Sequence, residues 1–446
     1  MTDGFDLLIR APRTICGAEE RPATIGVRAG SIAAVAPLDQ AAAAPNVIEL
    51  TASEVLLPGL VDSHVHICEP GHADWEGFAT ATLAAAAGGI TTLVDMPLDS
   101  LPSTTSVAAL ELKRQAASGQ TYVDVGFWGG VIRGNESEFE SLHHAGVLGF
   151  KCFLADSGSA DFLPVSADEM EAALRRLRPL STPLLVHAQS AEAAAAIPAA
   201  AGRSYANYLA SRPRGIENLA ICQVIEAARR SGGRAHIVHL SSSDALPMIG
   251  SARREGISLS AETCPHYLIL SSEEIADGAT ACKASPPVRE AANRELLWDG
   301  LRAGLLDLVV SDHSPATVAM KHTDAGDFGA AWGGISSLQL GLPLIWTAAR
   351  SKGFSLADVA TWMSQRPAQL AGLRKKGRIA PGYDADFCIF VPDEPLLVDP
   401  AMIRHKHPLT PYAGRTLTGS VSGSILRGEL IDLERPRGEL LRRDPQ

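Results

Sequence analysis

The sequence predicts an α/β protein built on a (β/α)8 barrel, with β-rich segments at both ends of the chain. The middle of the 446-residue chain alternates short apolar runs with longer stretches of helix-forming composition, and eight such runs can be counted. Most of the runs are continuously apolar, as expected of parallel strands that are buried on both faces. The length fits one large barrel that carries a smaller appendage.

The eight strand candidates follow one another between residues 56 and 370. In order, they are GLVDSHVH, ITTLVDMP, YVDVGFWGGV, VLGFKCFL, PLLVHAQS, AHIVHLSS, SLSAETCPHYL and DLVVSDHSP. The two ends of the chain instead contain short alternating runs joined by turns, such as ATIGVRAGSIAAVAP and LTGSVSGSILRGELIDL. We therefore divide the chain into β-rich ends at residues 1–55 and 371–446 and a barrel at residues 56–370.

The composition limits the kinds of partner. The formal net charge is −11, so the average surface would repel nucleic acid and anionic membranes, and neither is an expected partner. The start, MTDGFDLLIRAPRTICG, lacks the features of a signal peptide, and no apolar run is long enough to span a bilayer, which predicts a cytoplasmic protein. The seven cysteines include no CxxC pair, so imidazole and oxygen would have to hold any bound metal.

Two histidines, His64 and His66, stand one residue apart at the end of the first strand candidate. Alternate side chains of a strand share a face, so both imidazoles point the same way, which suits a metal ion. Taken alone, the pair is equally typical of polar residues where a strand reaches solvent. A metal site therefore requires partners from other strands.

Such partners occur at the ends of four other strand candidates. Lys151 lies in the fourth, His187 ends the fifth, His239 ends the sixth and Asp312 ends the eighth. The carboxyl ends of barrel strands meet at a common mouth, where the catalytic groups of such barrels lie. The sequence therefore predicts one shared metal site there.

Two of these assignments required a choice between neighbouring residues. His236 and His239 are three residues apart and should face opposite sides of a strand. We expect His239, nearer the carboxyl end, to be the ligand and His236 to be structural. Likewise, we expect Asp312 to be a ligand and the following His313 to be structural.

Lys151 requires a chemical change before it can bind a metal. A lysine amine, with a pKa of about 10.4, is cationic. Reaction with CO2 would convert it to a carbamate, whose two oxygens can bridge two divalent ions at about 3.5–4 Å from each other. Two such ions can hold a hydroxide and lower its pKa toward neutrality. The alternative is a lysine in a salt bridge inside the barrel.

These motifs resemble the cyclic amidohydrolases, the family of dihydroorotases, hydantoinases and allantoinases. The likeness covers DSHVH, GFKCFL, LLVHA, HIVHLSS, ETCPHYL and SDHSP in that order. It implies that both β-rich ends form one small β-sandwich domain and that the protein is a homotetramer. It also implies two divalent metal ions per chain: one held by His64, His66 and Asp312, the other by His187 and His239, with carboxylated Lys151 bridging them.

The metal that we expect is zinc, although such a site also accepts manganese, cobalt or iron. Within the family, AWGGISSLQLGLPLIW and HPLTPYAGRTLTGSVSGSILRGE most resemble the allantoinases. The implied reaction is hydrolysis of the hydantoin ring amide of allantoin to allantoate by a hydroxide held between the metals, with Asp312 transferring its proton. Cys68 stands where dihydroorotases typically carry an arginine for a substrate carboxylate, which favours a neutral substrate.

The resemblance also implies substrate contacts. Backbone groups that orient the ring in the family map onto Ser285, Gly333 and Gly334, and we expect Cys68 to line the pocket, with a buried inert thiol as the alternative. Cys68 and Asp99 both stand where allantoinases usually have asparagine. Two other functions stay open: a hydantoinase or dihydropyrimidinase, and a non-enzymatic scaffold of the same fold, in which metal ligands would be lost.

Overall fold

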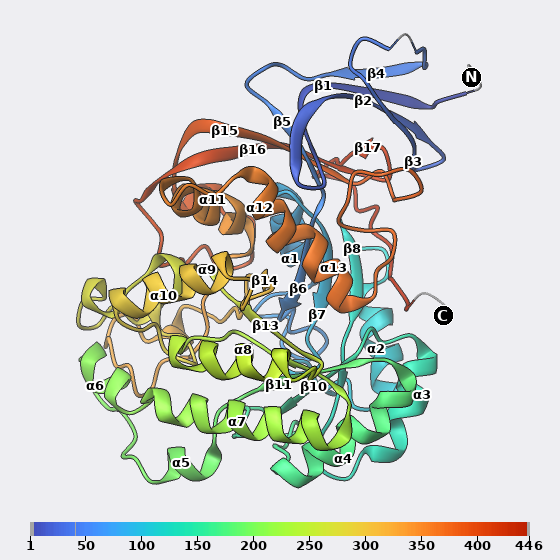
Figure 1. Ribbon diagram of the computed structural model, residues 1–446. Coiled ribbons are helices and arrows are strands. Elements are labelled where there is room, and N and C mark those ends of the chain that lie inside the picture. Colours follow the sequence, from blue (N-terminus) through green and yellow to red (C-terminus); the bar gives the residue numbers. More distant parts are fainter. Residues whose placement is uncertain (1–3, 41, 444–446) are drawn as a thin grey trace.

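The two ends of the chain meet in one sheet beside a barrel in the computed structural model, which describes residues 4–40 and 42–443 (Figure 1). The strand order of this sheet is β17-β16-β15-β5-β1-β2-β3, and β4 pairs with β1. The N-terminal strands are β1 (Leu7–Cys16), β2 (Glu19–Arg28), β3 (Ser31–Ala36), β4 (Asn46–Glu49) and β5 (Val55–Pro58). The C-terminal strands are β15 (Phe387–Leu397), β16 (Thr416–Leu426) and β17 (Glu429–Leu430).

β5 joins the two ends of the chain. It pairs with β1 on one side, with Leu56 opposite Thr14, and with β15 on the other, with Pro58 opposite Phe387. Apolar side chains of these strands pack into a separate small core, which includes Ile9, Ile25, Leu56, Phe387 and Ile425. The predicted β-sandwich built from both termini is therefore confirmed.

The barrel strands are parallel, and all eight predicted runs contain one. They are β6 (Leu60–Val65), β7 (Ile90–Asp95), β8 (Asp124–Phe127) with β9 (Gly129–Gly130), β10 (Phe150–Phe153), β11 (Pro183–His187), β12 (Arg234–Ile237), β13 (Leu259–Thr263) and β14 (Leu308–Val309). Every residue of β6, β7, β10 and β11 is buried, as expected of strands covered on both faces. The predicted α/β barrel is confirmed.

The third strand is interrupted at Trp128, between β8 and β9. The Trp128 backbone N–H donates to the carbonyl of Asp95 in β7 at 3.0 Å, and its indole Nε1–H donates to the carbonyl of Ser63 in β6 at 2.9 Å. Trp128 thus joins the three-stranded segment β6-β7-β8 to the six-stranded segment that runs from β9 to β14.

The ring closes between the first and last strands. The backbone N–H of His66 donates to the carbonyl of His313 at 2.9 Å, and the buried Asp62 carboxylate accepts the backbone N–H of Ser311 at 3.1 Å. These contacts join the end of β6 to the segment that follows β14. The predicted ligands at the first strand, His64 and His66, are therefore held next to Asp312, the predicted ligand at the last strand.

The helices cover the barrel from outside (Figure 1). They are α1 (Phe78–Ala87), α2 (Val107–Ala117), α3 (Phe139–Ala145), α4 (Ala167–Leu177), α5 (Ala191–Ala195), α6 (Tyr205–Ala210), α7 (Arg214–Ser231), α8 (Leu246–Arg254), α9 (Pro265–Ile269), α10 (Ala291–Arg302), α11 (Gly341–Ser351), α12 (Leu356–Ala360) and α13 (Arg366–Ala371). Local sequence sets their ends: Ser166 and Glu169 form a capping box that begins α4, and Gly232, at φ 65°, ends α7.

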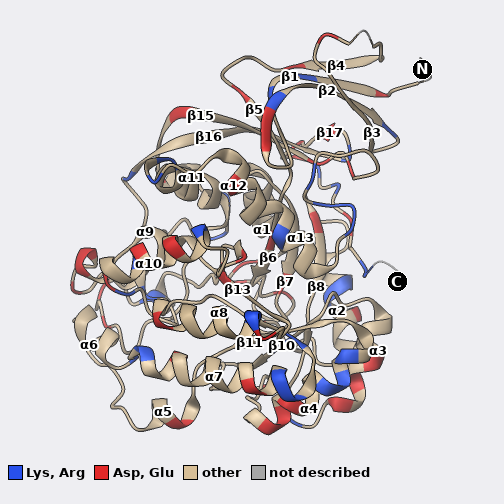
Figure 2. Cartoon of the chain, in the orientation of Figure 1, with Lys and Arg blue, Asp and Glu red and all other residues tan. Residues whose placement is uncertain are grey.

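Acidic and basic residues lie side by side on α4 (Figure 2). One such pair joins two helices, since the Arg230 Nε of α7 lies 2.6 Å from Glu171 Oε2 of α4. Among the helices of residues 4–40 and 42–443, none is both long and apolar enough to cross a membrane. The domain boundaries after residues 55 and 370 stay predictions; β5 belongs to the sheet of the termini, and the first barrel strand begins at Leu60.

A buried lysine connects the barrel to the sheet of the termini. Lys376 Nζ lies 2.6 Å from a carboxylate oxygen of Asp124 in β8, 2.7 Å from one of Asp386 and 3.0 Å from one of Asp384, both just before β15. Asp124 also accepts from Arg427, at 2.6 Å. The two parts of the molecule therefore share one compact cluster of buried charges.

Removal of this lysine should destabilise the protein strongly. We expect Lys376→Met to lower the free energy of unfolding by about 3–5 kcal/mol, because buried carboxylates lose their counter-charge. Urea denaturation of both proteins measures the difference. The adjacent exposed Lys375, changed to Met, is the control and should shift it by less than about 0.5 kcal/mol. Equal effects of the two substitutions would contradict a special role for the buried cluster.

Candidate functional site

A cavity of about 310 Å³ opens at the carboxyl ends of the barrel strands. Five of the six residues predicted to bind metal line it: His66, Lys151, His187, His239 and Asp312. The sixth, His64, is fully buried beside them, with its Nε2 atom 3.1 Å from an Asp312 oxygen. The barrel thus brings the six side chains together from five strands.

His64, His66 and Asp312 form one group. A ligand atom of each lies within 4.8 Å of the others. Burial opposes ionisation of Asp312, but the adjacent His64 outweighs it and lowers the pKa of Asp312 well below its usual range. Asp312 is therefore an ionised carboxylate flanked by two imidazoles, a set of donors that zinc and similar ions accept.

The other face of His66 meets an acidic side chain. Its Nδ1 atom lies 2.7 Å from Oδ2 of Asp99, and Oδ1 of Asp99 accepts from the hydroxyl of Ser159 at 3.1 Å. A carboxylate on the far nitrogen of a ligating histidine fixes the tautomer and orients the ring. Asp99 therefore supports His66 and also lines the cavity.

His187 and His239 form the second group. His187 Nδ1 and His239 Nε2 are 2.9 Å apart, and His187 Nε2 lies 2.9 Å from the side-chain oxygen of Gln189. Burial, with the Lys151 charge, lowers the pKa of His187 to about 3, and burial with neighbouring His187 lowers the pKa of His239. Both rings are therefore neutral at pH 7, the form in which imidazole binds metal.

Lys151, in β10, lines the cavity together with members of both groups and is fully buried. Its Nζ atom has neither a hydrogen bond nor an ion pair with any residue in the described part of the chain, and it lies 5.0 Å from the centre of the Phe153 ring. Burial lowers the pKa of Lys151 to about 8. The salt bridge considered from sequence is therefore not formed among these residues.

A glutamate that sequence reasoning did not assign organises the histidines. Glu262 in β13 is fully buried, and its Oε1 atom lies 2.5 Å from His64 Nδ1 while Oε2 lies 2.9 Å from His236 Nε2. The backbone N–H of His239 also donates to Oε1, at 3.3 Å. A charged residue inside the apolar strand LSAET is the signal that could have identified it.

The structure corrects the alternation argument for His236 and His239. His236 contacts Glu262 through its ring and His239 only through its backbone N–H, and alternation does not relate their side chains because the two residues do not lie on one regular strand. The reason is that β12 ends at Ile237, and His239 has a positive φ of 39° beyond it. His236 bonds through both ring nitrogens, to Ser260 and Glu262, whereas His239 Nδ1 has no hydrogen-bond partner in the structure.

Several residues at the site have left-handed backbone conformations. His239, Asp312, Cys68 and Asp99 have φ values of 39°, 47°, 65° and 61°. Each costs a non-glycine residue of order 1–3 kcal/mol and persists only where the surroundings enforce it. Asp312 likewise lies beyond β14, which ends at Val309, so a turn rather than the strand itself aims its carboxylate.

Two buried lysines hold the loop at residues 329–334, which forms one wall of the cavity. Lys321 Nζ donates to the carbonyls of Gly334 at 2.5 Å and Trp332 at 3.0 Å, and Lys283 Nζ donates to that of Ala331 at 2.5 Å. Burial lowers the pKa of Lys321 to about 7 and that of Lys283 to about 8. The loop thereby keeps Trp332 and Gly333 in the cavity wall.

The predicted substrate contacts divide into two groups. Ser285 and Gly333 line the cavity, but Cys68 and Gly334 do not. Cys68 is turned away by its positive φ; its thiol donates to the carbonyl of His66 at 3.6 Å, and burial raises its pKa well above the usual range. A side chain on Gly334 would approach Ser314 to 2.5 Å, so this glycine permits close packing behind the wall.

Other lining residues were not assigned from sequence. Gln189 lies two residues beyond the end of β11, and its side-chain oxygen lies 2.9 Å from His187 Nε2. Arg212, Trp332 and Ser157 lie on loops, where no periodicity marks them. A second trio of potential ligands, Cys264 and His266 with Asp312, is also buried, but burial raises the pKa of Cys264 well above its usual range and keeps the thiol protonated.

Residues 55–431 match the amidohydrolase family. The chain belongs to this family. It is 50% identical to the allantoinase of Streptomyces avermitilis over 99% of both chains, and 45% identical to that of Saccharomyces cerevisiae over 84% of this chain and 82% of the yeast chain. Among solved structures, the L-hydantoinase of Arthrobacter aurescens has a TM-score of 0.89 and a sequence identity of 30% to this chain. The match covers 99% of this chain and 98% of the hydantoinase chain.

The side chains of this amidohydrolase suit divalent metal ions. His239 Nδ1 and Lys151 Nζ are buried without a hydrogen-bond partner, in a site that also holds an ionised carboxylate. Buried polar atoms are rarely left unbonded, and each such case in a native structure requires an explanation. A carbamate on Lys151 that contacts a bound cation would account for the buried Lys151 nitrogen.

Glu262 should control metal affinity without touching a metal. We expect Glu262→Gln to lower the affinity for Zn²⁺ roughly 10–100-fold, because residues that orient ligating histidines typically contribute that much. Titration of the metal-free protein against a chromophoric chelator measures the affinity. Exposed Glu140, changed to Gln, is the control. Unchanged affinity in a folded Glu262→Gln protein would contradict the orienting role.

Proposed function

We propose that the protein is an allantoinase, which hydrolyses the hydantoin ring amide of allantoin to allantoate. The observation that carries this proposal is the 50% identity to the Streptomyces avermitilis allantoinase over 99% of both chains. The cavity supports it, because metal-binding and proton-accepting side chains converge there at the carboxyl ends of barrel strands.

In this proposal each chain holds two divalent ions, and the expected metal is zinc. His64, His66 and Asp312 would hold one ion, His187 and His239 the other, and a CO2-derived carbamate on Lys151 would bridge the pair. Bound ions would supply a hydroxide nucleophile at neutral pH and polarise the carbonyl that it attacks. The unbonded Lys151 Nζ supports the carbamate, since no residue in the described structure forms a hydrogen bond or an ion pair with it.

The side chains of the protein then move the proton and hold the ring. Asp312, ionised and close to His64, accepts the proton of the nucleophile and delivers it to the leaving ring nitrogen. Ser285 and the Gly333 segment, held by the two buried lysines, would orient the hydantoin ring. We do not include Cys68 or Gly334 among the substrate contacts.

The second candidate is a hydantoinase or dihydropyrimidinase, which the structural likeness to the Arthrobacter aurescens L-hydantoinase favours. The allantoinase proposal is preferred because sequence identity to named allantoinases is higher. All six predicted ligands are present around one cavity, which gives no support to a scaffold without catalysis. A homotetramer and a cytoplasmic location stay predictions.

A substrate panel tests the proposal. Allantoin should be hydrolysed with a kcat/KM at least about 100-fold above that for dihydroorotate, because Cys68 stands where a dihydroorotase would carry an arginine for the substrate carboxylate. Hydantoin and dihydrouracil complete the panel. A comparable kcat/KM for dihydroorotate would contradict the allantoinase assignment, and a preference for hydantoin or dihydrouracil would favour the second candidate.

Lys151→Ala tests the carbamate. We expect metal and activity to be lost together, since two cations would face each other with one bridging anion fewer. Acetate or propionate at high concentration, added with metal, should restore part of the activity by placing two oxygens in the vacated space. Metal content by elemental analysis and turnover of allantoin are the measurements.

The matched control is Lys352→Ala, a change of a partly exposed lysine that forms an ion pair with Glu295 at the surface. It should leave metal content and turnover unchanged. Full metal content and substantial turnover in Lys151→Ala would reject the carbamate.

A further inference from the structure

One arginine, Arg212, lines the cavity. The two lysine and arginine side chains of the lining are Lys151 and Arg212. Lys151 is fully buried at the floor, together with the proposed metal ligands, whereas Arg212 is partly exposed. Arg212 therefore lies at the rim, on the solvent side of the reacting groups.

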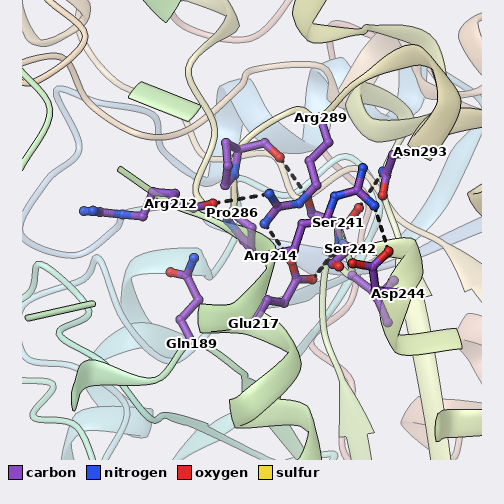
Figure 3. Close-up of polar contacts among 12 residues, drawn as sticks. Gln189, Arg212, Arg214, Glu217, Ser241, Ser242, Asp244, Pro286, Arg289 and Asn293 are labelled. Atoms are coloured by element: carbon purple, nitrogen blue, oxygen red, sulfur yellow. Dashed lines mark hydrogen bonds and ion pairs between the residues drawn. The ribbon is translucent and has the colours of Figure 1, made fainter. Parts of the chain in front are cut away.

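The backbone of Arg212 is held by a buried ion pair (Figure 3). Arg289 donates through Nη1 to the carbonyl of Arg212 and through Nη2 to Glu217 Oε2, both at 3.2 Å. Glu217 Oε1 in turn accepts the backbone N–H groups of Ser241 and Ser242 at 2.8 and 3.1 Å. The segment before α7 is thus fixed to the next βα loop of the barrel.

The Arg212 side chain itself takes no part in this network. In Figure 3 it extends away from Arg289 and Glu217. Neighbouring Arg214 uses its guanidinium on carboxylates of Asp244 and Glu290, at 2.8 and 2.6 Å. Within the described residues, the hydrogen bond of the Arg212 guanidinium goes to the carbonyl of Ser211 at 3.1 Å. Most of its five N–H donors therefore remain for a ligand.

The position of Arg212 limits what that ligand group can be. The amide to be hydrolysed must lie on the floor beside His187, His239 and Asp312, so a group that reaches the rim is remote from the reacting bond. Asp156 is the exposed carboxylate of the lining, and it disfavours an anionic group there. The planar guanidinium donates to planar oxygen acceptors, and beside Asp156 the acceptor that fits is a neutral group with a carbonyl oxygen.

We propose that Arg212 determines specificity by donating hydrogen bonds to the carbonyl oxygen of the ureido substituent of allantoin. This inference rests on the proposed function and names the group that recognises the substituent rather than the ring. The contact is remote from the reacting atoms and is equally strong before and during reaction. It therefore contributes to KM and much less to kcat.

Steady-state kinetics of the metal-loaded enzyme test the assignment. In Arg212→Gln the KM for allantoin should rise about 10–100-fold, while kcat stays within about threefold. Arg212→Lys keeps the positive charge but loses the planar, forked guanidinium, so its KM should lie between those of wild type and Arg212→Gln. The control is Arg230→Gln, at the other end of α7 and outside the cavity lining, which should leave KM and kcat unchanged.

Competition with unsubstituted hydantoin separates the substituent from the ring. Its inhibition constant should be the same in wild type and Arg212→Gln; no inhibition in either also supports the proposal, because binding then requires the substituent. An unchanged KM for allantoin, a loss confined to kcat, or an inhibition constant that rises with KM would overturn it.

Two further outcomes keep the test decisive. If Arg212→Gln does not fold or load metal, Arg212→Lys decides, and a wild-type KM in that variant overturns the proposal. Wild-type protein that hydrolyses hydantoin or dihydrouracil but not allantoin contradicts the proposed function, and the inference with it. Where the wild type does hydrolyse allantoin, the KM of the variants decides on Arg212 alone.

Discussion

The carboxylate of Glu262 lies inside the barrel without access to solvent, and three histidines satisfy it. Its two oxygens contact the rings of His64 and His236, at 2.5 and 2.9 Å, and accept the backbone N–H of His239. A buried carboxylate without such partners would cost several kcal/mol. The contacts that satisfy Glu262 also orient the histidines, because His64 meets Glu262 through Nδ1 and turns Nε2 toward Asp312.

The unusual backbone geometry of the site depends on this arrangement. His239 and Asp312 both follow the ends of their strands and both have positive φ, which two independent strand ends would not adopt without enforcement. Glu262 holds the backbone of His239, while Asp62 holds Ser311, next to Asp312. Closure of the barrel between its first and last strands therefore places the site as well as completing the fold.

The sequence was sufficient for the barrel and for the choice of its six polar strand-end residues, because buried parallel strands are continuously apolar and polar residues stand out at their ends. It could not describe how His239 is aimed, since alternation holds only within a strand and β12 ends two residues earlier. Glu262 was visible as a charge within an apolar strand. Arg212 was not, because only the folded chain shows that Arg289, Glu217 and Ser241 place its loop at the rim.

We propose that these side chains form a two-metal site bridged by a carboxylated lysine. The most direct test is a crystal structure of the zinc-loaded protein, with anomalous diffraction recorded at the zinc absorption edge. We expect two anomalous peaks per chain: one contacting His64, His66 and Asp312, the other contacting His187 and His239. Density for a carbamate on Lys151 should join them. A fully loaded, active protein with its metal elsewhere, or with an unmodified Lys151 between the peaks, would contradict this proposal.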